Sequence, residues 1–394
     1  MPRWFARTPC AGPGPHPSRA KLRIGIPRVP NLWSTHQFWH GLFTALGIDP
    51  RHLIFSSDTS EEQGREFGKG RGTVDCCYPV KCISGHYGEL VFGQRDKLDI
   101  IFSPMIYNLP SFLSGHVARS LTCPRVMAAP ENIKAGFLKE RDAFAEQGSA
   151  TSPLSCRSTS RSWSPSSSSG DCGTRCPGSP RPRPPEAVTA GYRTLQEFSD
   201  GLRRRSREVL EWCARESRSA ILVLARPYHM DPGIGHEIEV DIQAHGYPIL
   251  WGQYLPLDPD LLDWAFGPDV AAGHIRSPLD IRDVWPSSYS ANTNEILWGA
   301  KFAARLPWIS CVVRLSSYEC GMDQPTYTPV QQIVERSGTL FFSFQDLDST
   351  KPAGSLKIRV ETITHYLAAH AASIIEKKKA AMPPACPILA PIAG

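Results

Sequence analysis

Cysteines gather where the chain turns. The sequence places them in DCCYPVKC (75–82), in TCP (122–124) and in YECGMD (318–323). Each lies beside Gly, Pro or a charged residue and not inside an apolar run. Thiolates are soft ligands, so three of them brought together from separate loops suit a metal ion or an iron–sulfur centre. We therefore predict that Cys77, Cys123 and Cys320 are metal ligands.

Local physics supports a thiolate at the first of these sites. Cys76 and Cys77 precede a segment that is predicted to be a helix. Pro79 suits the first turn of this helix, where a backbone N–H has no partner within the helix. The helix dipole favours a thiolate there. The alternative is a buried, inert cysteine, which we expect for Cys213 and Cys311. A vicinal Cys76–Cys77 disulfide is a further alternative, disfavoured by strain.

Polar residues also follow a buried strand in the second half. Arg226, Tyr228 and His229 stand between that strand and a Gly-rich loop, so they could form the wall of a cofactor site, or a turn with local hydrogen bonds. The segment 283–294 could line a cleft or cap a helix at Asn294. His86 is expected to pack or face solvent. The sequence has no phosphate-loop, dinucleotide-binding, HExxH or GxSxG motif, so no ATP site is predicted.

Strands must position these loops, and they alternate with helices along the chain. In the first half, apolar runs predict strands at 21–29, 52–55, 98–103 and 125–129. Helical spacing predicts helices at 36–46 and from Tyr78 to Phe92, with Gly47 ending the first.

The second half repeats this order. Strands are predicted at 220–225, 248–251, 308–315 and 339–344. Helices are predicted at 192–215, 237–244, 294–305, 328–336 and 356–378, the last capped by Ser355. The expected fold is α/β, with two Rossmann-like, doubly wound lobes and a cysteine-lined cleft between them.

The expected domain boundaries follow from composition. Residues 21–148 form the N-terminal lobe and 189–378 the C-terminal lobe, with a disordered tail at 1–20 and a loose tail at 379–394. Between the lobes, 149–188 is irregular: residues 149–185 contain 12 Ser and 7 Pro. A natural linker explains this composition. The abrupt edges favour a frameshift that ends near Glu186, and the Cys172/Cys176 pair there is not expected to bind metal.

Composition limits the function classes. A chain of 394 residues, 41% hydrophobic, can build two or three cores. Residues 149–185 carry a net charge of +4 from five arginines and one aspartate, so the rest of the chain holds only about +1 of the total +5. Nucleic-acid binding is therefore not expected. No apolar run is long enough to span a membrane. Twelve cysteines without a signal peptide indicate a cytoplasmic protein with metal ligands or redox thiols, not a disulfide framework.

Several spaced motifs resemble a known family. IGIPRV with the helix HQFWHGLFTALG, then CYPVKCISGH, TCPRV, LARPYHMDPGIGHE and SYECGMD, follow in order. Together they are similar to the acyl-CoA dehydratase activase-related domain of the 2-hydroxyacyl-CoA and (R)-2-hydroxyglutaryl-CoA dehydratase activator system. The resemblance covers about 21–148 and 187–375.

The resemblance implies a [4Fe–4S] or related cluster held by loop cysteines between α/β lobes. An activase ATPase, as a separate chain or a lost fused part, would supply low-potential electrons, and an acyl-CoA could be the substrate. The family motif cysteines fall on Cys77, Cys123 and Cys320, with Cys76 and Cys82 as extra candidates. A homodimer is compatible with this resemblance.

The sequence therefore favours an iron–sulfur electron-transfer component, a possible subunit of an ATP-dependent dehydratase or reductase. The alternative is a non-catalytic docking or regulatory subunit of the activase, with zinc or no metal at the cysteines. A non-functional product of a damaged gene is a third reading, because of residues 149–188.

Overall fold

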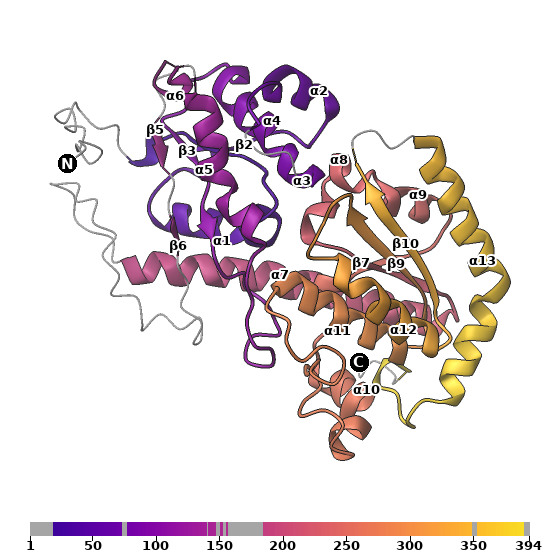
Figure 1. Ribbon diagram of the computed structural model, residues 1–394. Helices are drawn as coiled ribbons and strands as arrows, with labels where there is room; N and C mark the ends of the chain where they lie inside the picture. The colour runs from indigo at the N-terminus through magenta and orange to yellow at the C-terminus, as the bar shows by residue number, and fades with distance from the viewer. Residues whose placement is uncertain are drawn as a thin grey trace.

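The computed structural model describes residues 19–72, 77–139, 141–146, 150–152, 155–156, 184–348 and 353–389. It is a mixed α/β structure with two four-stranded parallel sheets (Figure 1). The strands are β1 Ile24–Ile26, β2 Leu53–Phe55, β3 Ile100–Phe102, β4 Met105–Ile106, β5 Ala150–Ser152, β6 Ser155–Cys156, β7 Ala220–Leu224, β8 Ile249–Trp251, β9 Ile309–Ser317 and β10 Leu340–Leu347.

Helices make up most of the remaining described chain. The α-helices are α1 Leu32–Ala45, α2 Glu61–Gln63, α3 Tyr78–Lys81, α4 Ile83–Gly88, α5 Pro124–Leu138, α6 Ala143–Glu146, α7 Pro184–Arg215, α8 Pro232–Gly235, α9 Ile238–Ala244, α10 Pro259–Ala271, α11 Ala291–Arg305, α12 Tyr327–Arg336 and α13 Ala353–Ala380. Short 3-10 and π turns are η1 Arg19–Lys21, η2 Pro50–His52, η3 Gly64–Gly68, η4 Glu89–Gly93, η5 Pro227–Met230, η6 Gly252–Tyr254, η7 Gln324–Thr326 and η8 Pro387–Leu389.

Both main sheets have the same strand order. The first runs β2-β1-β3-β5 and the second β8-β7-β9-β10, and all the pairs are parallel. In each sheet the second strand along the chain is added on one side of the first strand, and the later strands are added on its other side. The reversal lies between β1 and β3 in one sheet and between β7 and β9 in the other. At a reversal the connecting loops part at the carboxyl ends of the strands and leave room for a site.

The second sheet is buried on both faces. Every residue of β7 is fully buried, and its side chains alternate between two cores. Ala220, Leu222 and Leu224 pack with residues of α7, α10, α11 and α12, whereas Ile221 and Val223 pack with α9 and α13. The all-apolar sequence of β7 reflects this burial on both sides.

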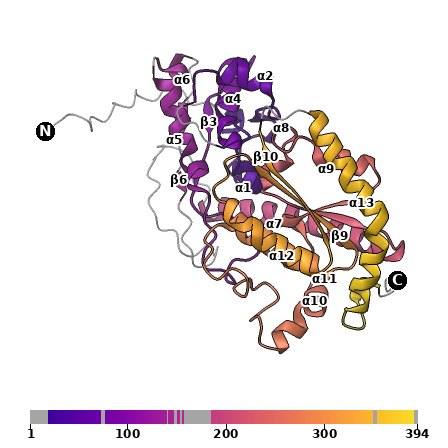
Figure 2. The same cartoon turned by 45° about the vertical axis from the view of Figure 1, so that its right-hand side comes forward.

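Helix α7 connects the two sheets (Figures 1 and 2). Its 32 residues give a length of about 48 Å at ~1.5 Å per residue. Near its start, Gly191 lies against Phe38 of α1, where a Cβ would come within 2.8 Å of the Phe38 carbonyl oxygen. Near its end, Leu210 and Cys213 belong to the core of the second sheet. One continuous helix therefore spans both cores.

Two predictions about the elements are wrong, and one helix was missed. Residues 125–129 are not a strand but lie in α5, because Pro124 opens a helix whose buried side chains recur at helical spacing through Ile133 and Phe137. Helix α10 was not predicted; two prolines obscure its pattern. Ser355 does not cap the last helix, because α13 begins at Ala353.

The segment predicted to be irregular, 149–188, contains β5, β6 and the first residues of α7. Strand β5 pairs with β3, and β6 with β4. Residues 1–18, 157–183 and 390–394 lie outside the described residues, and so do Cys172 and Cys176. The linker and frameshift interpretations both stay predictions. Within the described parts of the chain, no helix combines the length and the apolar character needed to cross a membrane.

Candidate functional site

Cys77 stands at the start of a helix, as predicted. It is the N-cap residue of α3, with Pro79 in the first turn, and its side chain is 7% exposed. Cys76, the neighbouring candidate, lies outside the described residues. Cys82 follows α3 and its thiol interacts with the hydroxyl of Tyr78. Burial raises the pKa of Cys82 to about 12, despite the Tyr78 hydrogen bond, so its free thiol is protonated at neutral pH.

Cys123 repeats this arrangement on a longer helix. It is the N-cap residue of α5, and Pro124 follows it directly. The cysteine is half-buried. The prediction that it precedes a strand is wrong, but its position at the start of a helix matches the arrangement at Cys77. Each cysteine is thus fixed where a helix begins and proline sets the backbone angle.

Cys320 lies in the turn after β9. Its backbone N–H donates to the Ser317 carbonyl over 3.2 Å, and Glu319 before it has a left-handed φ of 61°. This turn folds Cys320 back over the end of the strand, where it is 7% exposed. Burial raises the pKa of the Cys320 thiol, and the nearby carboxylate of Asp323 raises it further.

One small pocket of about 20 Å³ brings these three cysteines together. Its walls come from the starts of α1, α3, α5 and α11 and from the loops that follow β7 and β9. Residues from both halves of the chain therefore line it. The side chains that line it are Pro30, Asn31, Ser34, Cys77, Pro79, Cys123, Val126, Arg226, Tyr228, Asn292 and Cys320. The pocket therefore lies at the strand ends where both sheets reverse direction. Cys82 and His229 do not line it.

The thiols of this pocket are not arranged around a single ion. No group of three or more His, Cys, Asp or Glu among the described residues stands close enough together to hold one metal ion. A volume of about 20 Å³ has room for roughly one water molecule. The three predicted cysteines thus line a pocket that is too small for more than about one water molecule.

A buried cluster of Arg226, Arg314 and Asp323 lies next to the pocket, and its Arg226 lines the pocket wall. The Arg226 Nε donates to Asp323 Oδ1 over 3.0 Å, and Arg314 Nη2 lies 3.1 Å from the same oxygen. Ser316 Oγ donates to the other carboxylate oxygen over 2.8 Å. Burial alone would raise the pKa of Asp323, but the two guanidinium groups and the hydroxyl outweigh it and hold this pKa well below its usual range. The cluster places a net positive charge beside Cys320.

The other two cofactor candidates differ in position. Tyr228 lines the pocket, and burial holds the pKa of its hydroxyl well above the usual range, so the phenol stays neutral. His229 is completely buried, and its ring nitrogens lie 3.2 Å from the Arg226 carbonyl and 3.1 Å from Ser317 Oγ. Burial lowers the pKa of His229 to about 4. A neutral His229 thus joins the loop after β7 to the end of β9.

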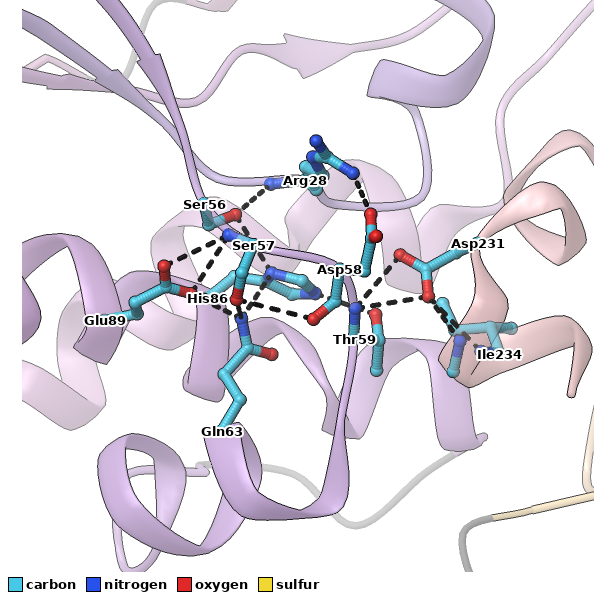
Figure 3. Close-up of polar contacts among 11 residues, drawn as sticks. Arg28, Ser56, Ser57, Asp58, Thr59, Gln63, His86, Glu89, Asp231 and Ile234 are labelled. Carbon is cyan, nitrogen blue, oxygen red and sulfur yellow. Dashed lines mark hydrogen bonds and ion pairs between the residues drawn. The ribbon is translucent and has the colours of Figure 1, made fainter.

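A second polar contact links the two halves of the chain (Figure 3). Asp231 N-caps α8, accepting from the backbone N–H of Gly233 over 2.9 Å, and it also accepts from the N–H of Thr59 over 3.2 Å. The Thr59 hydroxyl is 3.0 Å from Nε2 of His86. Both nitrogens of this imidazole have partners, since Nδ1 is 3.1 Å from the side-chain amide of Gln63.

His86 therefore packs in the interior and shows no sign of ligand binding. Burial lowers its pKa to about 3, which keeps the ring neutral at physiological pH. Nδ1 accepts from the Gln63 amide, so the Nε2–H donates to Thr59. This arrangement fixes the loop that contacts Asp231 next to the pocket.

Sequence reasoning missed several residues of the site. Asp323 was noted only as part of a motif, and Glu295 was not assigned a role. Asn292 lies in the segment 283–294 that was predicted to line a cleft, and it lines the pocket. The alternative of a helix cap at Asn294 is wrong, because α11 begins at Ala291. One signal was present: Arg314 is the only charged residue in the buried strand β9, and a charged side chain in a buried strand requires a partner. The identity of that partner depends on the turn after β9 and could not be read from spacing.

Together, the parallel sheets and the pocket define the class: a mixed α/β protein with parallel sheets and a small pocket lined by three cysteines. Residues 23–255, more than half of the chain, match the family model of the CoA enzyme activase uncharacterised domain (DUF2229). The chain belongs to this family, which confirms the resemblance to activase-related proteins. The matched range includes Cys77 and Cys123 and ends before Cys320. A comparison with curated proteins found no match.

Proposed function

We propose that this chain is an iron–sulfur electron-transfer component of an activase-dependent system for acyl-CoA dehydration or reduction in the cytoplasm. The observation that carries the proposal is the lining of one pocket by Cys77, Cys123 and Cys320, which come from three separate parts of the chain. In this proposal the two parallel sheets are Rossmann-like lobes, and the pocket is the innermost part of a cysteine-lined cleft between them.

The donor set suits an iron–sulfur cluster. The thiols are soft ligands, and no carboxylate or imidazole lines this pocket among the described residues. When bound, such a cluster supplies one-electron chemistry at a potential set by burial and by hydrogen bonds to sulfur. Arg226 and Tyr228 line the pocket and would provide the positive charge and the hydrogen-bond donor.

The pocket of about 20 Å³ would have to enlarge to hold an iron–sulfur cluster. A cluster has several atoms between its thiolates, so its ligands stand farther apart than those of a single ion. Side chains that now fill the pocket would have to move outward, and the thiol protons would have to leave, because ligation requires thiolates. In the thiol form, burial and the Asp323 carboxylate oppose this ionisation at Cys320, and the Arg226 guanidinium favours it.

The proposed partner is an activase ATPase on a separate chain, and the proposed substrate is an acyl-CoA. Both rest on the family, whose description names CoA enzyme activase. In this scheme, ATP is used by the partner, and the present chain receives the electron.

A second function is supported by a specific observation. No metal-binding group of three side chains is present among the described residues, and the pocket is small. The small pocket suits a docking or regulatory subunit of the activase whose cysteines hold no metal. The zinc-bound form of this alternative would require the thiols to regroup around one ion. The two functions differ visibly, because zinc-bound protein is colourless and iron–sulfur protein is brown.

Serine substitutions test the proposal. Cys123→Ser and Cys320→Ser should each lose most of the visible absorbance that the wild type gains after anaerobic reconstitution with iron and sulfide, because serine is a harder, poorer ligand. Cys386→Ser is the matched control, since Cys386 is a buried cysteine that does not line the pocket. Equal absorbance in all four proteins would argue against ligation by these cysteines.

A further inference from the structure

A larger cavity of about 670 Å³ adjoins the cysteine pocket. Its walls are α1, α7, residues 110–114, η6 and the start of α11. Ser34 and Asn292 line both the cavity and the pocket, so the two spaces are immediate neighbours. The volume lies within the range of about 300–1,000 Å³ that is typical of sites for organic ligands.

The lining combines aromatic rings with cationic groups. Trp33, Phe112 and Tyr192 are among the aromatic side chains of the wall. Arg203 has a side chain 16% exposed, and its guanidinium lies over the Phe112 ring, 5.6 Å from the centroid. Such a lining suits a molecule with an apolar or planar body and an anionic group, because arginine pairs in a planar, bidentate manner with carboxylates.

One buried acid faces this cavity. Glu295 in α11 is 6% exposed and is the only carboxylic acid among the described residues that line the space. Its Oε2 accepts from the Asn292 amide over a long 3.4 Å, and the Ser111 hydroxyl is its other hydrogen-bond partner. Burial raises the pKa of Glu295 to about 7, although Ser111, Asn292, Arg203 and Arg226 all favour the ionised form.

The other titratable groups around the cavity come from several elements. Helix α7 provides Arg193 and Arg203, α1 provides His36, and η6 provides Tyr254. Burial raises the pKa of Tyr254 to about 12, so its hydroxyl stays neutral. Burial lowers the pKa of His36 below its usual value. Glu295 and His36 are therefore the two groups of this wall whose charge could change the affinity for an anion near neutral pH.

We propose that this cavity binds a carboxylate-bearing organic molecule, with Arg203 pairing with its carboxylate and protonated Glu295 donating a hydrogen bond to it. Ionised Glu295 would repel the anion, so binding takes up a proton. The site is next to the cysteine pocket and requires no iron. Binding at this site can therefore be tested independently of the proposed cluster.

Two probes of the same shape test the charge preference. We would titrate the full-length protein with 2-naphthoate and with 2-naphthamide, following tryptophan fluorescence and heat release. At about pH 6, naphthoate should bind at least about tenfold more tightly, because it alone can form the charged pair with Arg203. Arg203→Gln should abolish this preference, and Arg204→Gln, an exposed neighbour on the same helix, should retain it. Equal binding of the two probes to the wild type would overturn the proposal.

The pH dependence identifies the acid. Wild-type affinity for naphthoate should fall about tenfold between about pH 6 and pH 8 as Glu295 ionises. Glu295→Gln should keep the higher affinity throughout, because glutamine stays neutral and still donates. His36→Asn should retain the wild-type decline. A decline that persists in Glu295→Gln and disappears in His36→Asn would assign the proton to His36 and refute the role of Glu295.

Discussion

Asp323 holds two buried arginines beside the cysteine pocket. Arg226 and Arg314 are 2% and 0% exposed, and both approach the same carboxylate oxygen. A buried guanidinium is tolerated only with a paired charge and satisfied hydrogen bonds. The geometry of Arg226 at the pocket wall therefore depends on Asp323.

Asp323→Asn should lower the free energy of unfolding by about 3–5 kcal/mol, because it leaves buried cations uncompensated. Urea denaturation measures this difference. The control is Glu208→Gln, which removes a 2.8 Å ion pair with Arg205 whose side chains are 59% and 74% exposed. That change should cost under about 1 kcal/mol. Similar losses in both variants would contradict the assignment of Asp323 to a buried cluster.

The same carboxylate predicts a pH dependence. The pKa of Asp323 is held below its usual range in the folded protein, so its stabilisation is complete above about pH 4, the usual value for an unfolded aspartate. The stabilisation is lost as the pH falls below that value toward the folded pKa. The difference in unfolding free energy between wild type and Asp323→Asn should accordingly shrink in acid.

At the scale of elements, the short helix α8 presses against the N-terminal half. A Cβ on Gly233 would lie 1.9 Å from the Thr59 carbonyl oxygen, a backbone atom that cannot rotate away. Asp231, two residues earlier, accepts from the N–H of the same Thr59. The close approach therefore requires glycine and positions the loop that carries Arg226 and Tyr228.

Gly233→Ala should destabilise the protein by about 1–3 kcal/mol, since the loop must shift to admit the methyl group. Gly267→Ala is the matched control: Gly267 lies inside α10 with open space around its Cβ position. Because alanine favours a helix over glycine by about 1 kcal/mol, this control should be stabilised. Thermal unfolding of both variants gives the comparison, and stabilisation of both would disprove the contact with Thr59.

Some of these elements could be predicted from the sequence, and others could not. The strand at 220–225 was predictable because an unbroken apolar run of that length between turns is typical of a strand covered on both faces. Residues 125–129 were wrongly predicted as a strand, because a run of five mostly apolar residues fits both the strand and the helix periodicity. The helical spacing becomes clear only when the run is followed to Phe137. The turn cysteines could be singled out by neighbouring Gly and Pro. The burial of Glu295 could not, since it depends on distant segments that lie against α11, among them Ser111 and η6.

At the scale of the whole molecule, the pocket exists only because loops from both halves of the chain meet there. Helix α7 extends along both halves and contributes to both cores (Figure 1). Tyr78, Tyr228 and Ile234 form a small buried cluster from both halves. Cys77 and Cys123 come from one half and Cys320 from the other. Any ligand of all three thiols would therefore also join the halves and stabilise the whole chain.

The most direct measurement is the iron and acid-labile sulfide content of the full chain purified without oxygen. An iron–sulfur component should contain about four irons and four sulfides per chain, and the brown protein should bleach in air. Zinc, or no metal even after reconstitution with iron and sulfide, would contradict the proposed function and favour the docking subunit of the activase.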